Sequence, residues 1–251
     1  MAKTDYFSSP KPRVFAHRGF SFNDASLDEN TIEAFRAALA LGAGFIETDA
    51  QATADQVAVL FHDTDLKRLC QIDAKVSELT FAEIQEVSLQ NGGKIPSLRE
   101  VLVELDGAKL NIDIKAKNAI LPTVQAIEET SAHHRVLVSS FSNRRRTAAL
   151  SALSKPVATS GSMANVLQIW SSYRFFGGLG LKALTKDIDA LQLPLRYGSI
   201  TFRDQGFIQA MAKHDVEVHF WTVNDQPQMR ELLAIGASGI VTDRTDLSSI
   251  L

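Results

Sequence analysis

The sequence predicts a single (β/α)₈ TIM barrel, and three observations favour this fold. Eight short apolar runs rich in Val, Ile and Phe alternate with longer stretches whose apolar spacing is helical. The length of 251 residues suits eight βα units of roughly 30 residues each. No G-x-G-x-x-G loop follows the first run, although an open doubly wound sheet, the alternative fold, would normally carry one.

The expected strands are short and apolar because a closed barrel buries them on both faces. They cover residues 14–16, 45–49, 110–114, 136–139, 157–159, 190–193, 217–222 and 239–242. We expect a helix over residues 31–41, with Asn30 as its cap and Glu33 completing a capping box.

Residues 57–96 interrupt this alternation. An apolar stretch over 57–61 leads into a polar loop, a short helix near 81–87, and the pair Gly92 and Gly93. The segment is too long for an ordinary βα loop. We therefore expect a small insertion after the second strand region, over the C-terminal face of one barrel domain that spans residues 1–251.

Composition and charge exclude several classes of function. A net charge of −3 and a sequence pI near 6.1 give no general attraction to nucleic acid or anionic lipid. Arg144 to Arg146 form a tight basic run, which we interpret as a solvated helix face. The sequence shows no secretory signal and no apolar run near the roughly 20 residues that cross a bilayer, and Cys70 alone allows no internal disulfide. We expect a cytoplasmic protein without stable membrane association or a nucleic-acid partner; its oligomeric state is not indicated.

Alternation along two expected strands places acidic side chains on one inner face. Glu47 and Asp49 share a face of the second strand, and Asp113 and Lys115 share a face of the third. Buried acids need neutralisation, and three carboxylates suit one divalent cation, Mg²⁺ or Ca²⁺, better than a structural zinc. An ion-pair network in which Lys115 and Arg18 balance the acids is the alternative.

Two histidines follow apolar runs at the predicted functional end of the barrel. His17 and Arg18 come directly after the first strand, and His62 follows residues 57–61. Two imidazoles that titrate near neutral pH can serve as general acid and general base on opposite sides of a phosphoryl group. A structural role for the pair is the alternative, and the surrounding acids and cations disfavour it.

These residues stand in ordered blocks that resemble the signature of the glycerophosphodiester phosphodiesterase family. The blocks are Ala16-His17-Arg18-Gly19, Glu29-Asn30-Thr31, Ala34-Phe35, Gly42-Ala43, Glu47-Thr48-Asp49, Thr53, Val59-Leu60-Phe61-His62-Asp63, Ile95-Pro96-Ser97-Leu98-Arg99-Glu100-Val101-Leu102, Asn111-Ile112-Asp113-Ile114-Lys115, Ser140-Phe141, Trp221-Thr222-Val223-Asn224 and Val241-Thr242-Asp243-Arg244. Their order and spacing match that family over nearly the whole chain.

The resemblance implies a metal-dependent hydrolysis of glycerophosphodiesters to glycerol 3-phosphate and an alcohol. It implies that Glu47 and Asp49 bind the metal, and that Asp113 is the third ligand at a position where many members have glutamate. That departure leaves the choice between Mg²⁺ and Ca²⁺ open. Asp28 stands where the family usually has proline.

The mechanism implied by the resemblance uses two histidines. The neighbouring glycerol hydroxyl attacks phosphorus, and water then opens the cyclic phosphate. His17 and His62 exchange the protons, in an order that the sequence does not indicate, while Arg18 and Lys115 hold phosphate charge. Loss of either histidine is expected to reduce the rate about 10²- to 10⁴-fold.

Three further residues are expected to line the substrate pocket. Phe141 and Trp221 stand at strand ends, where aromatic rings could cover the glycerol or the leaving group, although core packing is an equal alternative. Gln192 could reach the site from the sixth strand. His219 shares the inner face with Trp221, and we interpret it as a core histidine.

Three alternative functions remain from the sequence. A lysophospholipase D-like enzyme would need an apolar rim on the insertion, and a non-catalytic phosphodiester-binding barrel would leave both histidines unexplained. A Schiff-base enzyme built on Lys115 is disfavoured because Asp113 and Glu47 should keep the lysine charged. The sequence does not indicate a preference among choline, ethanolamine, glycerol and inositol leaving groups.

Overall fold

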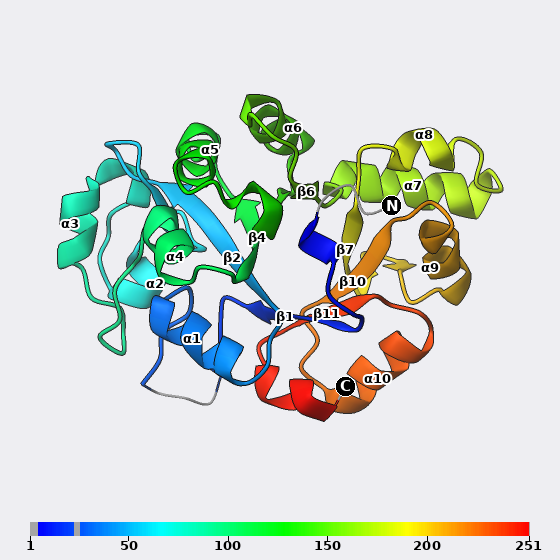
Figure 1. Ribbon diagram of the computed structural model, residues 1–251, viewed down its shortest axis with the longest axis horizontal. Coiled ribbons are helices and arrows are strands. Elements are labelled where there is room, and N and C mark those ends of the chain that lie inside the picture. The colour runs from blue at the N-terminus through cyan, green and yellow to red at the C-terminus, as the bar shows by residue number, and fades with distance from the viewer. Residues whose placement is uncertain (1–4, 23–25, 251) are drawn as a thin grey trace.

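Eight parallel strands form a nearly closed ring with helices outside it in the computed structural model, which describes residues 5–22 and 26–250 (Figure 1). The ring strands are β1 (Arg13–His17), β2 (Phe45–Ala52), β4 (Lys109–Ile114), β5 (Val136–Ser139), β6 (Ala158–Thr159), β7 (Ala190–Pro194), β10 (Glu217–Trp221) and β11 (Gly239–Thr242). Their order is β6-β5-β4-β2-β1-β11-β10-β7. The parallel bridge between Ser160 and Ala190 brings the two ends of this order together, so the predicted barrel is confirmed.

The helices connect successive strands and surround the ring. They are α1 (Ile32–Ala40), α2 (Lys67–Cys70), α3 (Phe81–Glu86), α4 (Leu98–Glu104), α5 (Ile120–Glu129), α6 (Asn143–Ala152), α7 (Met163–Phe175), α8 (Leu181–Thr185), α9 (Gln205–Ala212) and α10 (Gln226–Ala234). The remaining elements are η1 (Asp5–Phe7), β3 (Ala58–Leu60), η2 (Val76–Glu78), η3 (Ala132–Arg135), β8 (Arg196–Tyr197), β9 (Ile200–Thr201) and η4 (Thr245–Ile250). β2 is longer than predicted because β3 folds back and pairs with it, Ala50 opposite Leu60.

On β1 and β2, the side chains inside the ring change from aromatic to polar towards the C-terminal ends of the strands. Near the N-terminal ends, Phe15 and Phe45 pack with Tyr6 of η1, which closes the base of the barrel. Two residues further along the same strands, the inner face carries His17 and Glu47, because alternate side chains share a face. His17 and Glu47 therefore lie at the C-terminal mouth of the barrel.

An ion pair ties the first strand to the seventh strand of the barrel at its base. The buried guanidinium of Arg13 donates to both carboxylate oxygens of Glu217, at 2.6 and 2.8 Å. His219 lies in the core as predicted, with its Nε2 3.1 Å from Glu217 Oε2 and its ring against Phe15.

Two separate apolar clusters join the ring to its helices. One lies between β2, β4 and β5 and the helices α1, α4 and α5, around Ile46, Ile112 and Val138. The other lies between β7 and β10 and the helices α7, α9 and α10, around Leu191 and Phe220. The strands β2, β4, β5, β7 and β10 therefore bury apolar side chains against the helices on their outer faces.

The inserted segment between β3 and α4 has an apolar cluster of its own and rests on the loop that follows β1. Leu66, Val76 and Ile84 are buried in that cluster. The buried carboxylate of Asp28 accepts hydrogen bonds from the backbone N–H groups of Asn91 and Gly93. Asp28 thus fastens the insertion to the barrel.

The structure corrects two expectations about helix ends. Thr31, not Asn30, caps α1: its hydroxyl accepts from the N–H of Ala34, whereas the Asn30 side chain contacts Thr48 and Asp49. The basic run Arg144 to Arg146 is not a uniformly solvated face. Arg146 is buried and its guanidinium reaches the Thr159 hydroxyl.

Across the described residues, no helix is long and apolar enough to cross a membrane.

Candidate active site

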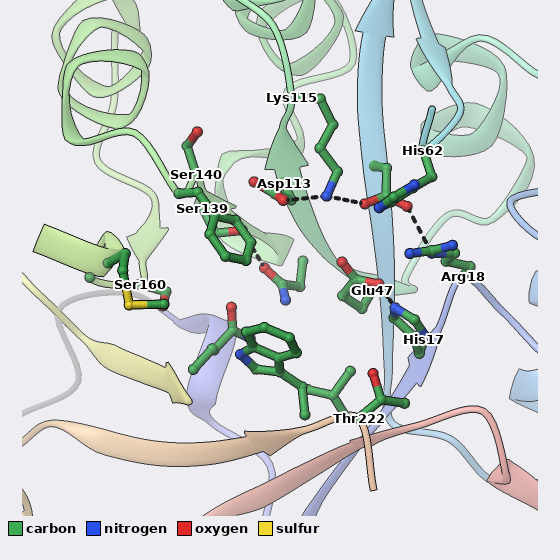
Figure 2. Close-up of a pocket in the computed structure, with 18 of the residues that line it drawn as sticks. His17, Arg18, Glu47, His62, Asp113, Lys115, Ser139, Ser140, Ser160 and Thr222 are labelled. Carbon is green, nitrogen blue, oxygen red and sulfur yellow. Dashed lines mark hydrogen bonds and ion pairs between the residues drawn. The ribbon is translucent and has the colours of Figure 1, made fainter. Parts of the chain in front are cut away.

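All ten residues that the sequence singled out line one cavity of about 210 Å³ at the C-terminal mouth of the barrel (Figure 2). They are His17, Arg18, Glu47, Asp49, His62, Asp113, Lys115, Phe141, Gln192 and Trp221. Figure 2 shows the charged side chains on one side of the cavity, from β1, β2, β4 and the insertion, and Ser139, Ser140 and Ser160 on the other.

The Lys115 ammonium group lies between two of the predicted metal ligands. Its Nζ is 2.8 Å from Asp49 Oδ1 and 2.6 Å from Asp113 Oδ2 (Figure 2). Burial alone would raise the pKa of Asp49, but the charges of Lys115 and Arg18 lower it below its usual value. For Asp113, burial outweighs the attraction of Lys115 and raises the pKa. The ion-pair network considered from the sequence is therefore formed around these two acids.

Glu47 lies outside that network. It is buried, and its Oε2 atom has no hydrogen-bond partner among the described residues. Burial, followed by repulsion from Asp49, raises the pKa of Glu47 to about 7. One oxygen of Asp113, Oδ1, is orphaned in the same way within the described chain.

A carboxylate orients His17. Its Nδ1 is 2.6 Å from Asp243 Oδ1, and the other oxygen of Asp243 accepts from the Asn224 side chain at 2.7 Å. Burial lowers the pKa of His17, but the hydrogen bond to Asp243 and the charge of Glu47 outweigh it, so the net pKa is raised. With Nδ1 held by Asp243, Nε2 is the ring nitrogen left for the cavity, 3.9 Å from Glu47 Oε2.

His62 has the same kind of partner. Its Nδ1 is 2.7 Å from Asp63 Oδ1. Burial would raise the pKa of Asp63, but hydrogen bonds from Arg68 and His62 lower it, so the carboxylate stays ionised. Each imidazole therefore has one nitrogen fixed by an aspartate and one free to exchange a proton.

Arg18 stands at the turn out of β1. Its backbone has φ 57°, a left-handed conformation that is uncommon for a residue with a side chain and is concentrated at functional sites. Its N–H donates to the carbonyl of Glu47, and its guanidinium contacts Asp49 and Glu29, both at 3.1 Å. This turn directs the guanidinium into the cavity.

The opposite wall of the cavity is built from uncharged groups. Phe141 and Trp221 meet edge to face with centroids 5.8 Å apart, and Phe141 is 53% exposed at the mouth. Gln192 Nε2 is buried without a hydrogen-bond partner among the described residues. Gly161 and Met163 extend the wall at the start of α7.

Sequence reasoning assigned no role to Asp63, Asp243 and Asn224. All three stand in motif blocks, and strand register could have pointed to Asp243. Thr242 of β11 lies beside Ala16 of β1, so the next residues along, Asp243 and His17, must be neighbours at the strand ends. That register depends on which strands are adjacent, which local sequence patterns do not specify.

The fold and the site together define a barrel enzyme. Its cavity is lined by two histidines that are each held by an aspartate, and by the cationic side chains of Arg18 and Lys115. The profile described as "Glycerophosphoryl diester phosphodiesterase family" matches residues 17–247, and the chain belongs to that family.

Relatives agree with this assignment. The chain is 40% identical over 235 residues, 93% of its length and 88% of the relative's, to a Mycobacterium tuberculosis protein named "Probable glycerophosphodiester phosphodiesterase 2". It is 32% identical over 248 residues, 93% and 94% of the two chains, to the glycerophosphodiester phosphodiesterase of Caldanaerobacter subterraneus. An Oleispira antarctica phosphodiesterase, solved with the product sn-glycerol-3-phosphate, shares the fold at TM-score 0.75 and 21% identity over 95% of this chain and 96% of that one.

Proposed function

We propose that this glycerophosphodiester phosphodiesterase hydrolyses small glycerophosphodiesters to glycerol 3-phosphate and an alcohol with His17 and His62 as its acid–base pair. The observation that carries the proposal is the symmetry of the two imidazoles. Each has Nδ1 held by an aspartate, at 2.6 and 2.7 Å, and both line the same cavity as Arg18 and Lys115.

The arrangement of the two imidazoles supports the following proposed proton transfers. One imidazole removes the proton of the glycerol hydroxyl next to the phosphodiester as that oxygen attacks phosphorus, and the other protonates the departing alkoxide. The resulting cyclic phosphate is opened by water with the two roles reversed. Asp243 and Asp63 stabilise the imidazolium that forms at each step, and Arg18 and Lys115 stabilise charge on the non-bridging oxygens.

The oxygen ligands of the carboxylates suit a divalent cation, Mg²⁺ or Ca²⁺, but their present positions do not form a complete metal site. Buried Glu47 Oε2 and Asp113 Oδ1 have no hydrogen-bond partner in the described chain, and oxygen donors suit a hard cation. As the side chains stand, no three such ligands among residues 5–22 and 26–250 converge on one point. Glu47, Asp49 and Asp113 would hold the ion, which would polarise a phosphate oxygen and the attacking hydroxyl.

The inserted segment does not favour a lysophospholipase D-like activity. It would need an apolar rim on the insertion, yet Leu66 and Leu69 are buried in the cluster beneath it, and Leu79 and Phe81 pack against that cluster. Small glycerophosphodiesters are therefore the proposed substrates.

The test is release of glycerol 3-phosphate from glycerophosphocholine, glycerophosphoethanolamine, glycerophosphoglycerol and glycerophosphoinositol. We expect release that stops with EDTA, returns with Mg²⁺ or Ca²⁺, and falls about 10²- to 10⁴-fold in His17→Ala and His62→Ala. Folded protein that releases nothing from the four substrates with either ion would refute the proposed function. Full activity after treatment with EDTA would refute only the proposed metal dependence.

A further inference from the structure

Arg68 lies in α2 of the inserted segment, beside the cavity, and two carboxylates converge on it. Its Nε donates to Asp63 Oδ2 and its Nη2 to Glu29 Oε1, both at 2.6 Å. Asp63 belongs to the inserted segment and Glu29 to the loop between β1 and α1. A guanidinium is a rigid planar fork, so two short charged bonds fix the position of one carboxylate relative to the other.

Each carboxylate transmits this constraint to a residue of the proposed active site. Asp63 uses its other oxygen to hold His62 Nδ1 at 2.7 Å. Glu29 accepts from Arg18 Nη1 at 3.1 Å. A continuous chain of ion pairs therefore runs from the imidazole on the insertion, through Arg68, to the guanidinium on the barrel.

Stabilisation alone does not explain this arrangement. The Arg68 side chain is 46% exposed, and exposed ion pairs contribute little to folding stability. The same inserted segment contains a comparison pair, Lys75 and Glu78, at 3.0 Å with side chains 63% and 55% exposed. The Lys75–Glu78 pair is exposed, whereas the two partners of Arg68 contact His62 and Arg18 of the proposed active site.

We propose that Arg68 is a positioning residue that keeps the His62 imidazole and the Arg18 guanidinium in a fixed relation across the mouth of the barrel. The proposal rests on the proposed function, in which these two groups act on one phosphodiester. Because His62 is contributed by the insertion, its distance from the substrate depends on how firmly that segment is held against the barrel. Arg68 supplies that connection through Asp63, the carboxylate that holds the His62 ring.

The main experiment compares Arg68→Met with Lys75→Met, which makes the same change of charge in the same segment. Release of glycerol 3-phosphate from glycerophosphocholine is measured over a range of substrate concentrations. In Arg68→Met we expect kcat to fall roughly 10- to 100-fold, the usual effect of a misplaced catalytic group. Lys75→Met should retain wild-type kinetics, and both variants should retain the wild-type thermal midpoint. Arg68→Lys, which keeps the charge but loses the fork, should recover only part of the rate.

Two double mutants separate the contact to His62 through Asp63 from the contact to Arg18 through Glu29. Asp63→Asn should lower kcat, because it acts on His62, whereas Glu29→Gln should mainly raise KM, because it acts on Arg18. Adding Arg68→Met to either variant should cost less than it costs in the wild type, since the connection is already broken. Full additivity of the losses would overturn the proposal.

A second readout does not depend on turnover. The ring ¹H–¹⁵N signals of His62 should match the wild type in Lys75→Met and change in Arg68→Met, while those of His17 stay the same. Unchanged His62 signals, or wild-type kinetics in Arg68→Met, would overturn the positioning role and leave the proposed function intact. An inactive wild type with the expected His62 change would instead overturn the proposed function alone.

Discussion

At the scale of single residues, the site is a set of charges that neutralise one another incompletely. Lys115 and Arg18 balance Asp49 and part of Asp113, and Glu47 remains buried with an orphaned oxygen. Strand alternation predicted which of these side chains face inward, because it is a local rule. It could not predict that Lys115 lies between two acids, because that depends on the relative height of adjacent strands.

The partner of His17 gives a prediction at this scale. Asp243→Asn removes the acceptor that fixes Nδ1, so the ring loses its preferred tautomer and the stabilisation of its charged form. We expect kcat to fall roughly 10²-fold or more. The matched control is Asp246→Asn, on the same segment, where the carboxylate pairs with Arg244. Equal rates in the two variants would show that Asp243 does not act on His17.

At the scale of elements, the eight strands were predictable because buried parallel strands are apolar on both faces. The capping role of Thr31 was not predictable, because Asn30 could also cap and only the fold shows that the Asn30 amide contacts Thr48 and Asp49. The docking of the insertion was also hidden. Asp28 differs from the family pattern, and its partners Asn91 and Gly93 are more than 60 positions away.

The docking of the insertion can be tested at Gly93. A Cβ there would lie 2.9 Å from Asp28 Oδ2, which hydrogen bonds already hold in place. Gly93→Ala should therefore displace Asp28 and lower the free energy of unfolding by roughly 1–3 kcal/mol. Urea denaturation measures the loss, and hydrogen exchange should show faster opening at Asn91.

The control is Gly44→Ala, where the added Cβ would meet no described atom within 4 Å. We expect that variant to be no less stable than the wild type. If Gly93→Ala is equally stable, the carboxylate of Asp28 moves freely and does not fasten the insertion.

At the scale of the whole molecule, the ion pair at the base predicts how stability depends on pH. Burial would raise the pKa of Glu217, but hydrogen bonds from His219 and Arg13 lower it to about 2. The folded state thus keeps Glu217 ionised below the pKa of the unfolded chain. The contribution, roughly 2 kcal/mol after solvent screening, is complete above about pH 4.5 and lost as the pH falls towards 2.

Urea denaturation between pH 2 and pH 7 checks this expectation. Glu217→Gln should be less stable than the wild type at pH 7, because it leaves the Arg13 guanidinium buried without a counter-charge, and the difference should shrink towards pH 2. Glu104→Gln is the control, since its pair with Arg36 is exposed on both sides. A difference that stays constant with pH would contradict the linkage.

The joint between β6 and β7 has a consequence for how the enzyme could diversify. The proposed reacting groups come from the inserted segment and from β1, β2 and β4, which are hydrogen-bonded side by side. The uncharged wall lies around the bridge from Ser160 to Ala190. In the proposed function, bond cleavage and selection of the alcohol would therefore use different arcs of one ring. Substitutions at Gly161, Met163 and Gln192, selected by laboratory evolution, should therefore change which alcohol is accepted. The residues proposed to cleave the phosphodiester should not need to change.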